Sequence, residues 1–195
     1  MKIVKKIYYK LFFLSISKII GFFSPRLYMK FYIKYLNNIG IKLLGIPRFI
    51  ASDCWFDGLD YSLIEIGHNV VISAYVKVLT HDYSMTRAFI ALRFPLETEV
   101  YKKSGVVIGD NSFIGLGSII MPGTRIGKNV IIGSGSVVRG FVPDNSIVIG
   151  NPAQVIGDTL EWGKKNINNL ENGIYGFDKK AILDDISLRV SLDQE

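Results

Sequence analysis

The 195-residue sequence has little of several residue types, and each shortage excludes a class of protein. Its one cysteine, Cys54, cannot form a disulfide within the chain, which excludes a disulfide scaffold. Its two histidines, His68 and His81, cannot complete the ligand set of a zinc finger with a single cysteine. Charged residues are also few, at 21% against 49% hydrophobic residues, which excludes intrinsic disorder. The length fits one folded domain, or one domain with an appendage.

Acidic residues are absent before Asp53, although ten lysines and arginines lie between Lys2 and Arg48. The first 52 residues therefore carry a charge of +10, whereas the rest, with 13 basic and 17 acidic residues, carries −4. The net charge of +6 thus describes an N-terminal segment and not the whole surface. Because no base-reading motif accompanies this charge, we predict no nucleic-acid partner.

The N-terminal segment, residues 1–45, also lacks an apolar run long enough to cross a membrane. Its longest apolar stretch, 11–23, is interrupted by Lys18 and is shorter than the roughly 20 residues of a spanning helix. Lysines and aromatic residues continue past the small residues that a signal peptidase could recognise, so we expect no cleaved export signal and a cytoplasmic protein. Two helices broken near Pro25 are predicted.

Two interpretations of this segment stay open. In one, it contacts the inner face of the cytoplasmic membrane, with basic residues facing anionic lipid and apolar residues at helical spacing entering the headgroup region. In the other, it forms a helical cap on the neighbouring domain and its lysines are solvated. The residues concerned are Lys2, Lys5, Lys6 and Lys10 on the basic side and Ile3, Ile7, Leu11 and Leu14 on the apolar side.

A period of six residues runs through the middle of the chain. Neither an α-helix, with a period of 3.6, nor a single strand, with a period of 2, produces this spacing. If six residues form one short strand and one corner, three such units close a triangular turn, and stacked turns pair as parallel strands about 4.8 Å apart. We attribute the glycines that follow several of the aliphatic residues to an unusual corner backbone. The aliphatic positions are Ile66, Ile72, Val78, Ile108, Ile114, Ile120, Ile126, Ile132 and Val138, and the glycines are Gly67, Gly109, Gly115, Gly127 and Gly133.

The repeat is interrupted once and then ends. Between Tyr83 and Gly105 it fails, which predicts a loop at 84–105 ejected from the coil, and long ordered loops are often functional. After residue 156 the pattern stops, and residues 157–195 predict a polar cap with a helix. Both termini are expected to cover strand edges that the coil ends would otherwise expose. The predicted organisation is therefore 1–45, a coil at 46–156 that carries the loop, and 157–195.

The repeat resembles the left-handed parallel β-helix of hexapeptide-repeat proteins over roughly residues 46–156. This resemblance, which supplies the handedness, predicts a mainly β fold with N-terminal helices and a C-terminal helical cap. Among hexapeptide proteins, two histidines exclude the carbonic anhydrases that need three, and 45 residues cannot supply the nucleotide-binding domain of a nucleotidyltransferase. Acyl transfer remains. The segments 79–84 (LTHDYS), 108–115 (IGDNSFIG) and 150–153 (GNPA) are similar to the maltose and galactoside O-acetyltransferases, especially the branch that acetylates bacterial surface polysaccharides.

The resemblance implies that His81 is the catalytic base. The chemistry agrees, because a neutral imidazole can take the proton of a sugar hydroxyl as it attacks a thioester carbonyl in a direct transfer. Asp82 is expected either to orient the imidazole or to contact the acceptor, although adjacent strand residues point to opposite faces. The backbone N–H of Leu116 is implied to stabilise the oxyanion. For acceptor binding we predict Asp57, Tyr83 and Arg87.

Acetyl-CoA is the implied co-substrate, with no metal, and a homotrimer with sites between neighbouring coils is the implied assembly. Arg139, or else Lys164 and Lys165, is expected to meet the CoA phosphates, because the basic residues that the family has nearby are missing. The glycines and serines of the expected groove also have structural reasons to occur in a repeat coil. The other residues predicted to bind the cofactor are Phe113, Gly117, Ser134, Gly135, Asn151, Pro152 and Ala153.

The sequence therefore predicts an acetyl-CoA-dependent O-acetyltransferase acting on a sugar hydroxyl of a surface polysaccharide or its precursor. Two alternatives stay open. The coil could serve N-acetylation of a nucleotide amino sugar or another small amine, since the fold does not select the acceptor. The chain could also be a non-catalytic β-helix scaffold held at the membrane by residues 1–45.

Overall fold

The computed structural model describes residues 24–58, 60–95 and 97–166, within two compact units that divide after Thr159. The first predicted N-terminal helix, the lipid-facing residues before position 24 and most of the predicted C-terminal cap lie outside the described residues.

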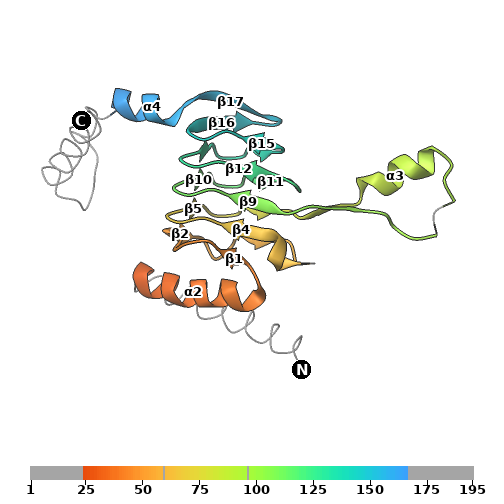
Figure 1. Cartoon of the computed structure of the whole chain (residues 1–195), viewed down its shortest axis with the longest axis horizontal. Coiled ribbons are helices and arrows are strands. Elements are labelled where there is room, and N and C mark those ends of the chain that lie inside the picture. Colours follow the sequence, from red (N-terminus) through yellow and green to blue (C-terminus); the bar gives the residue numbers. More distant parts are fainter. Residues whose placement is uncertain (1–23, 59, 96, 167–195) are drawn as a thin grey trace, which may run out of the picture. The chain divides into compact units, whose positions relative to one another are not determined.

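The first unit is a coil of short strands that stack into three parallel sheets (Figure 1). Sheet 1 contains β1 (Lys42–Leu43), β4 (Ile64–Ile66), β9 (Val106–Ile108), β12 (Arg125–Ile126) and β15 (Phe141–Val142). Sheet 2 contains β2 (Phe49–Ile50), β5 (Val71–Ile72), β10 (Phe113–Ile114), β13 (Ile131–Ile132) and β16 (Ser146–Gly150), and β17 (Ala153–Asp158) joins β16 in antiparallel fashion. Sheet 3 contains β3 (Trp55–Phe56), β6 (Lys77–Val78), β11 (Ile119–Ile120) and β14 (Val137–Val138). We call the turns between the sheets corner 1–2, corner 2–3 and corner 3–1.

Three parallel sheets of this kind are typical of a left-handed β-helix, so the predicted fold class is confirmed. The aliphatic residues of the six-residue period point inward and form the core, where Ile108, Ile114 and Ile120 are fully buried. Helices also stand where they were predicted, with α2 (Pro25–Ile39) before the coil and α4 (Thr159–Asn166) after it.

Helix α2 covers the N-terminal end of the coil. It begins after Ser24, whose hydroxyl accepts a hydrogen bond from the N–H of Leu27, and it ends at Gly40, whose positive φ suits a helix C-terminus. Its inner face belongs to the core, and the Tyr28 hydroxyl donates to the Ile50 carbonyl at 2.6 Å. The remaining inward side chains are Met29, Tyr32, Leu36 and Ile39. At the opposite end of the coil, β17 pairs with β16 along the edge of sheet 2.

A ladder of asparagine amides runs up corner 1–2. Asn69, Asn111, Asn129 and Asn145 all have φ between 55° and 59°, a left-handed conformation that asparagine tolerates better than most residues. The side-chain N–H₂ of each of the first three donates to the amide oxygen of the next asparagine at 2.8–2.9 Å. The ladder thus links four successive turns of the coil, and the six-residue period of aliphatic residues did not predict it.

Two substitutions of Asn111 separate the contribution of the amide hydrogen bonds to stability from that of the left-handed backbone. Asn111→Gly removes the two amide hydrogen bonds but keeps the backbone conformation, and we expect a loss of about 1 kcal/mol in the free energy of unfolding. Asn111→Ala also forces alanine into the left-handed region, which adds about 1 kcal/mol. Denaturant unfolding of both variants tests this order. An alanine variant at least as stable as the glycine variant would contradict it.

The glycines that follow the aliphatic residues have a different cause from the one expected. Gly67, Gly109, Gly115, Gly127 and Gly133 are not among the residues with positive φ. Instead, a Cβ at Gly109 would lie 2.4 Å from the carbonyl oxygen of Gly127 in the next turn. The expectation of an unusual backbone was therefore wrong for these glycines, which permit close stacking of one turn on the next.

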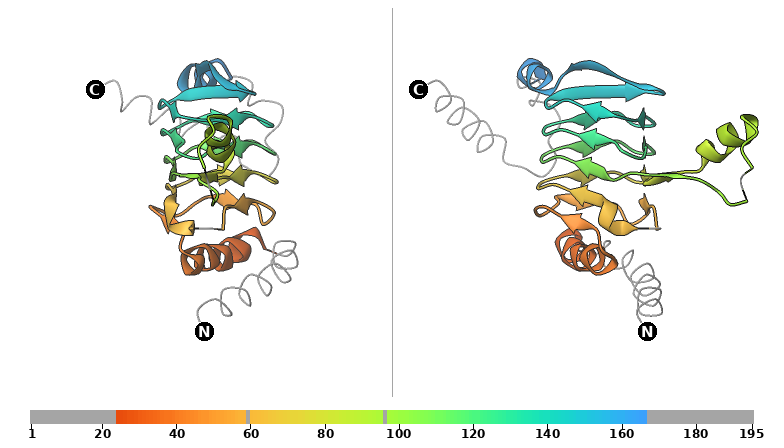
Figure 2. Two further views of the ribbon diagram at one scale, coloured as in Figure 1. Left: turned by 90° about the vertical axis from the view of Figure 1, so that its right-hand side faces the viewer. Right: turned by 45° about the vertical axis from the view of Figure 1, so that its right-hand side comes forward.

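The predicted loop leaves the coil at corner 3–1 (Figures 1 and 2). Its ends form an antiparallel ribbon of β7 (His81–Asp82) and β8 (Lys102–Lys103), and it carries helix α3 (Ser84–Ala91). The buried Thr86 closes the base of the loop, because its hydroxyl donates to the Val100 carbonyl at 2.7 Å and accepts from the Val100 N–H at 2.8 Å. The ejected segment is thus an ordered arm rooted beside His81.

Candidate active site

The β7–β8 ribbon presents two chemically different faces. His81 is paired with Lys103, and Asp82 with Lys102. Side chains alternate between the faces of a ribbon, so His81 and Asp82 point to opposite sides. The ring contacts of His81 place Tyr83 and Tyr101 on its face, whereas Asp82 and Lys102 line a hollow on the other.

His81 is held by a buried aspartate from the preceding turn of the coil. Asp57 is 1% exposed, and its Oδ2 accepts hydrogen bonds from the backbone N–H and the hydroxyl of Thr80, both at 2.9 Å. The same oxygen lies within hydrogen-bonding distance of Nδ1 of His81. Because an ionised carboxylate only accepts hydrogen bonds, this contact assigns the proton to Nδ1 and leaves the lone pair of Nε2 available. The side chain of His81 is 22% exposed, so a substrate can reach it.

The two aspartates lie in different surroundings, and a role for Asp57 at the acceptor stays a prediction. Asp57, predicted at the acceptor, lies beneath the imidazole, in the position expected of a residue that orients it. Asp82 does not orient His81, because its side chain turns away and accepts the N–H of Ser84 at 2.8 Å. That hydrogen bond holds the pKa of Asp82 below its ordinary value. A contact between Asp82 and the acceptor stays a prediction.

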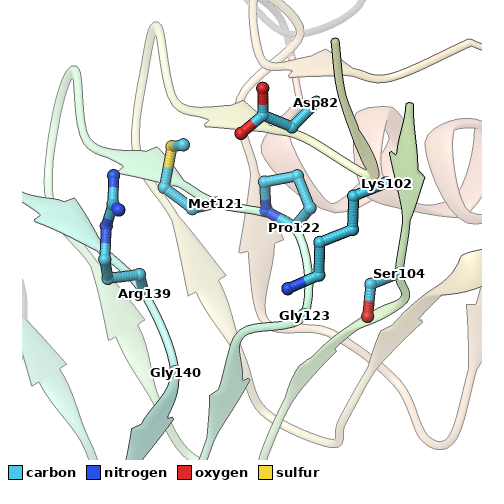
Figure 3. Close-up of a pocket in the computed structure, with 8 residues that line it drawn as sticks. All are labelled: Asp82, Lys102, Ser104, Met121, Pro122, Gly123, Arg139 and Gly140. Atoms are coloured by element: carbon cyan, nitrogen blue, oxygen red, sulfur yellow. The ribbon is translucent and has the colours of Figure 1, made fainter. Parts of the chain in front are cut away.

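A hollow of about 400 Å³ lies on the Asp82 side of the ribbon (Figure 3). Lys102 and Arg139 approach it from opposite sides, with Pro122 between them. Asp82 also lines it, and Arg139 contributes to lowering the pKa of this carboxyl. The hollow therefore combines two cations, one carboxylate and a floor of small residues, and this composition suits a ligand that carries phosphate. The remaining lining residues are Ser104, Met121, Gly123 and Gly140.

The other residues predicted to bind the cofactor lie elsewhere on the coil. Phe113 belongs to β10 of sheet 2, and Leu116 and Gly117 follow it in corner 2–3. Ser134 and Gly135 occupy the same corner one turn further on, where the Gly135 N–H donates to the Leu116 carbonyl at 2.8 Å. Corner 2–3 is not the corner that carries His81. A single chain therefore brings Arg139 near the ribbon but leaves the predicted oxyanion donor and most of the predicted donor groove on a different edge.

The remaining predicted residues are also spread out. Asn151 and Pro152 form the turn between β16 and β17, and Ala153 begins β17. Arg87, predicted to reach the acceptor, forms an ion pair with Glu99 within the arm. Sequence reasoning missed Tyr101, because it lies in the interruption, where the period gives no signal.

A second ion pair fixes the root of the arm and has a pH-dependent consequence. Asp60 accepts from Nζ of Lys103 at 2.9 Å and from the hydroxyl of Ser62 at 2.6 Å. The hydrogen bond from Ser62 is the main cause that lowers the pKa of Asp60 from 3.8 to about 2. Because the pKa is lower in the folded state, this contribution to stability is present above the ordinary pKa and is lost as the pH falls towards 2.

We expect Asp60→Asn to melt below the native protein at pH 7 and to approach it at pH 3. Thermal unfolding followed by circular dichroism at both pH values measures the two differences. A difference in melting temperature that stays constant between pH 7 and pH 3 would show that the charge of Asp60 contributes nothing.

Within 24–58, 60–95 and 97–166, no group of three or more histidine, cysteine, aspartate or glutamate side chains is placed to hold a metal ion. In the same part of the chain, no helix combines the length and the apolar character needed to cross a bilayer.

Comparison with known proteins identifies the family of the repeat. The family model described as bacterial transferase hexapeptide (six repeats) matches residues 105–140. Protein CapG of Staphylococcus aureus is 37% identical over 153 residues, which cover 75% of this chain and 85% of CapG. The lipopolysaccharide biosynthesis O-acetyl transferase WbbJ of Escherichia coli, whose own assignment is putative, is 31% identical over 52% of this chain and 55% of WbbJ. The galactoside O-acetyltransferase of Lactococcus lactis is 40% identical over 77% of this chain and 66% of that protein.

Solved structures show the same fold. A maltose O-acetyltransferase from Clostridium difficile has a TM-score of 0.52 at 22% identity and covers 78% of this chain and 87% of its own. A galactoside acetyltransferase in complex with coenzyme A has a TM-score of 0.52 at 19% identity, with 89% and 87% covered. The chain belongs to the hexapeptide-repeat acetyltransferases and is related to the maltose and galactoside O-acetyltransferases, WbbJ and CapG.

Proposed function

We propose that this chain transfers the acetyl group of acetyl-CoA to a sugar hydroxyl of a surface polysaccharide or its precursor, with His81 as general base. The pairing of His81 with the buried Asp57 is the observation that carries the proposal. It leaves Nε2 of His81 to take the hydroxyl proton while the oxygen attacks the thioester carbonyl. The C–S bond then breaks, and the imidazolium returns the proton to the departing thiolate, which leaves as CoA. The names of WbbJ and the galactoside O-acetyltransferase support a glycan hydroxyl as acceptor.

The experiment that tests this function is thiol release from acetyl-CoA by the purified full-length chain. The acceptors are methyl glycosides, nucleotide sugars, amino sugars and serine, and mass spectrometry with mild alkali distinguishes esters from amides. We expect alkali-labile acetyl esters on sugar acceptors. Turnover confined to amines would overturn O-acetylation, and no turnover together with no binding of acetyl-CoA would favour a scaffold.

We also propose that the active site is completed by a neighbouring copy of the chain in a homotrimer. His81 lies at corner 3–1 and Leu116 at corner 2–3, so a partner's corner must supply the oxyanion donor if both residues act on one substrate. The outer face of sheet 2 fits such an interface, because an unbroken register of apolar side chains runs along it. These side chains are Phe49, Val71, Phe113, Ile131 and Ile147.

Mixed trimers test the shared site. His81→Gln removes the base, and Ser134→Trp blocks the groove at an exposed position of corner 2–3. If the two defects lie on opposite sides of one interface, co-refolding the inactive variants restores about a quarter of the native activity by random assortment. Failure to recover activity in trimers verified by ultracentrifugation would place the whole site in one chain.

Peripheral membrane contact through residues 1–45 is a third part of the proposal. On the outer face of α2, Leu27 and Phe31 are exposed beside Lys30 and Lys34, and five further lysines precede position 24. Lys30→Glu with Lys34→Glu is expected to lower co-sedimentation of the full chain with phosphatidylglycerol vesicles, whereas Lys164→Glu with Lys165→Glu is the matched control. An equal loss of co-sedimentation in both double variants would show that the outer face of α2 is not the membrane-binding surface.

A further inference from the structure

We propose that Tyr83 and Tyr101 form an acceptor subsite, an aromatic platform that holds a pyranose ring beside the imidazole of His81. The inference rests on the proposed sugar O-acetylation and names the class of acceptor, a cyclic sugar in place of a small acyclic alcohol or amine.

The two tyrosines converge on His81 from opposite ends of the arm. Tyr83 follows β7 and Tyr101 precedes β8. Their ring centroids are 4.9 Å apart with an interplanar angle of 38°. The imidazole lies edge-on to both, at 5.2 Å from Tyr83 and 6.4 Å from Tyr101. The two phenol rings and the imidazole therefore form one cluster, in which His81 lies beside the tyrosine pair.

The cluster is open to solvent. Tyr83 is 41% and Tyr101 is 43% exposed, whereas Tyr28 and Tyr32, which have a packing role under the coil, are 4% and 2% exposed. The arm has other means of closure, because the β7–β8 pairing, the Thr86–Val100 hydrogen bonds and the Lys103–Asp60 ion pair all hold its root. Packing within one chain thus leaves these two rings exposed beside His81, where a ligand can contact them.

The chemistry of the platform fits a pyranose. The face of an aromatic ring is negative and attracts the C–H groups that one face of a pyranose presents. The phenol hydroxyls can donate to and accept from the hydroxyls at the rim of the sugar. Apolar aromatic walls with a few polar groups are typical of small-ligand sites. A sugar stacked on this pair would bring a ring hydroxyl to the side on which Nε2 of His81 takes its proton.

Sugar binding without turnover tests the subsite independently of acetyl transfer. The full-length chain is labelled with 3-fluorotyrosine, and its ¹⁹F spectrum is recorded while methyl β-D-galactopyranoside, methyl α-D-glucopyranoside or glycerol is added, with no acetyl-CoA present. Tyr83→Phe and Tyr101→Phe assign the two signals. We expect both signals to shift with at least one methyl pyranoside and not with glycerol. Unshifted signals with every pyranoside, or equal shifts with glycerol, would overturn the platform.

Steady-state kinetics then tests whether the two tyrosines act on acceptor binding. Tyr83→Leu and Tyr101→Leu should raise KM for a pyranoside about ten-fold, since the stacked ring is lost, while KM for acetyl-CoA stays unchanged. The Phe variants, which keep the ring, should stay within about three-fold of the native value. Phe141→Leu is the control, because it replaces an exposed aromatic residue on sheet 1 in the same way.

The outcomes of the two experiments are distinct. ¹⁹F shifts without transfer to any hydroxyl would leave the platform standing and overturn the proposed function. Transfer to a sugar that is equally fast in the Leu variants would overturn the platform and leave the function standing.

Discussion

His81→Gln is expected to lower kcat/KM for a hydroxyl acceptor about 10³-fold, the size of effect that loss of a general base has in other enzymes. Glutamine keeps a polar group that can hydrogen-bond Asp57, so the buried carboxylate retains a partner. Because the proposed role of His81 is to take the proton of the acceptor hydroxyl and not to bind CoA, we expect the affinity for CoA to stay within about two-fold. Thiol release and calorimetric titration with CoA measure the two quantities. A variant with native turnover would show that His81 is not the base.

The contact with Asp57 makes a matched prediction for the neighbouring residue. One oxygen of Asp57 faces both Thr80 and Nδ1 of His81, so Asp57→Asn can place only one kind of amide atom there. An amide oxygen keeps the hydrogen bonds from Thr80 and from Nδ1 but is uncharged, whereas an N–H₂ group gives up the Thr80 N–H, donates to Nδ1 and places the imidazole proton on Nε2. We expect kcat to fall about 10²-fold with little change in KM, because the neutral amide no longer stabilises the imidazolium and the Nε2–H tautomer cannot take the hydroxyl proton. Steady-state kinetics checks this division. A change confined to KM would instead support the acceptor-binding role first expected for Asp57.

The sequence predicted the coil well because its signal is local. Between β9 and β14 every turn has the same length, so Val107 pairs with Arg125, Phe113 with Ile131 and Ile119 with Val137, always 18 residues apart. The inward aliphatic residues of these turns have little freedom to vary, since each lies in a fully buried core. A period in the sequence therefore translates directly into a register in the structure.

The Asp57–His81 pair could not be predicted in the same way. Trp55 pairs with Lys77, 22 residues away, because the corner after Asp57 contains the short 3-10 helix Tyr61–Leu63. Extrapolating the 18-residue turn backwards from Lys77 would have placed a different residue there. Tyr101 was out of reach for a related reason, since only the antiparallel pairing of β7 with β8 brings the far end of the arm back to His81.

The glycines show a second limit of reasoning from the sequence. Their recurrence indicates a constraint, but a backbone constraint and a packing constraint give the same pattern of letters. The structure distinguishes the two constraints. Gly117 has φ +69° and open space where a Cβ would lie, whereas Gly109 is not among the residues with positive φ and has the next turn directly against it. One residue type thus serves two purposes at neighbouring corners.

Gly109→Ala is accordingly expected to be the most destabilising small change in the coil. The added Cβ would lie 2.4 Å from the carbonyl oxygen and 2.6 Å from the carbonyl carbon of Gly127. Both are backbone atoms, so no side chain can rotate away, and the two turns must separate. Separation would stretch the hydrogen bond from the Gly109 N–H to the Ile126 carbonyl, which is 2.9 Å long. We expect a loss of about 3 kcal/mol or more in the free energy of unfolding, at the upper end of the range for overpacked sites.

Gly117→Ala is the matched comparison, because it adds the same methyl group where no atom lies within 4 Å. Its cost is confined to the left-handed backbone and amounts to about 1 kcal/mol. Denaturant unfolding of both variants at one temperature compares the two constraints. If Gly109→Ala were no less stable than Gly117→Ala, close stacking of the turns could not be the reason for glycine at this position. The expected order would instead show that the spacing of these two turns depends on a glycine that places no side chain between them.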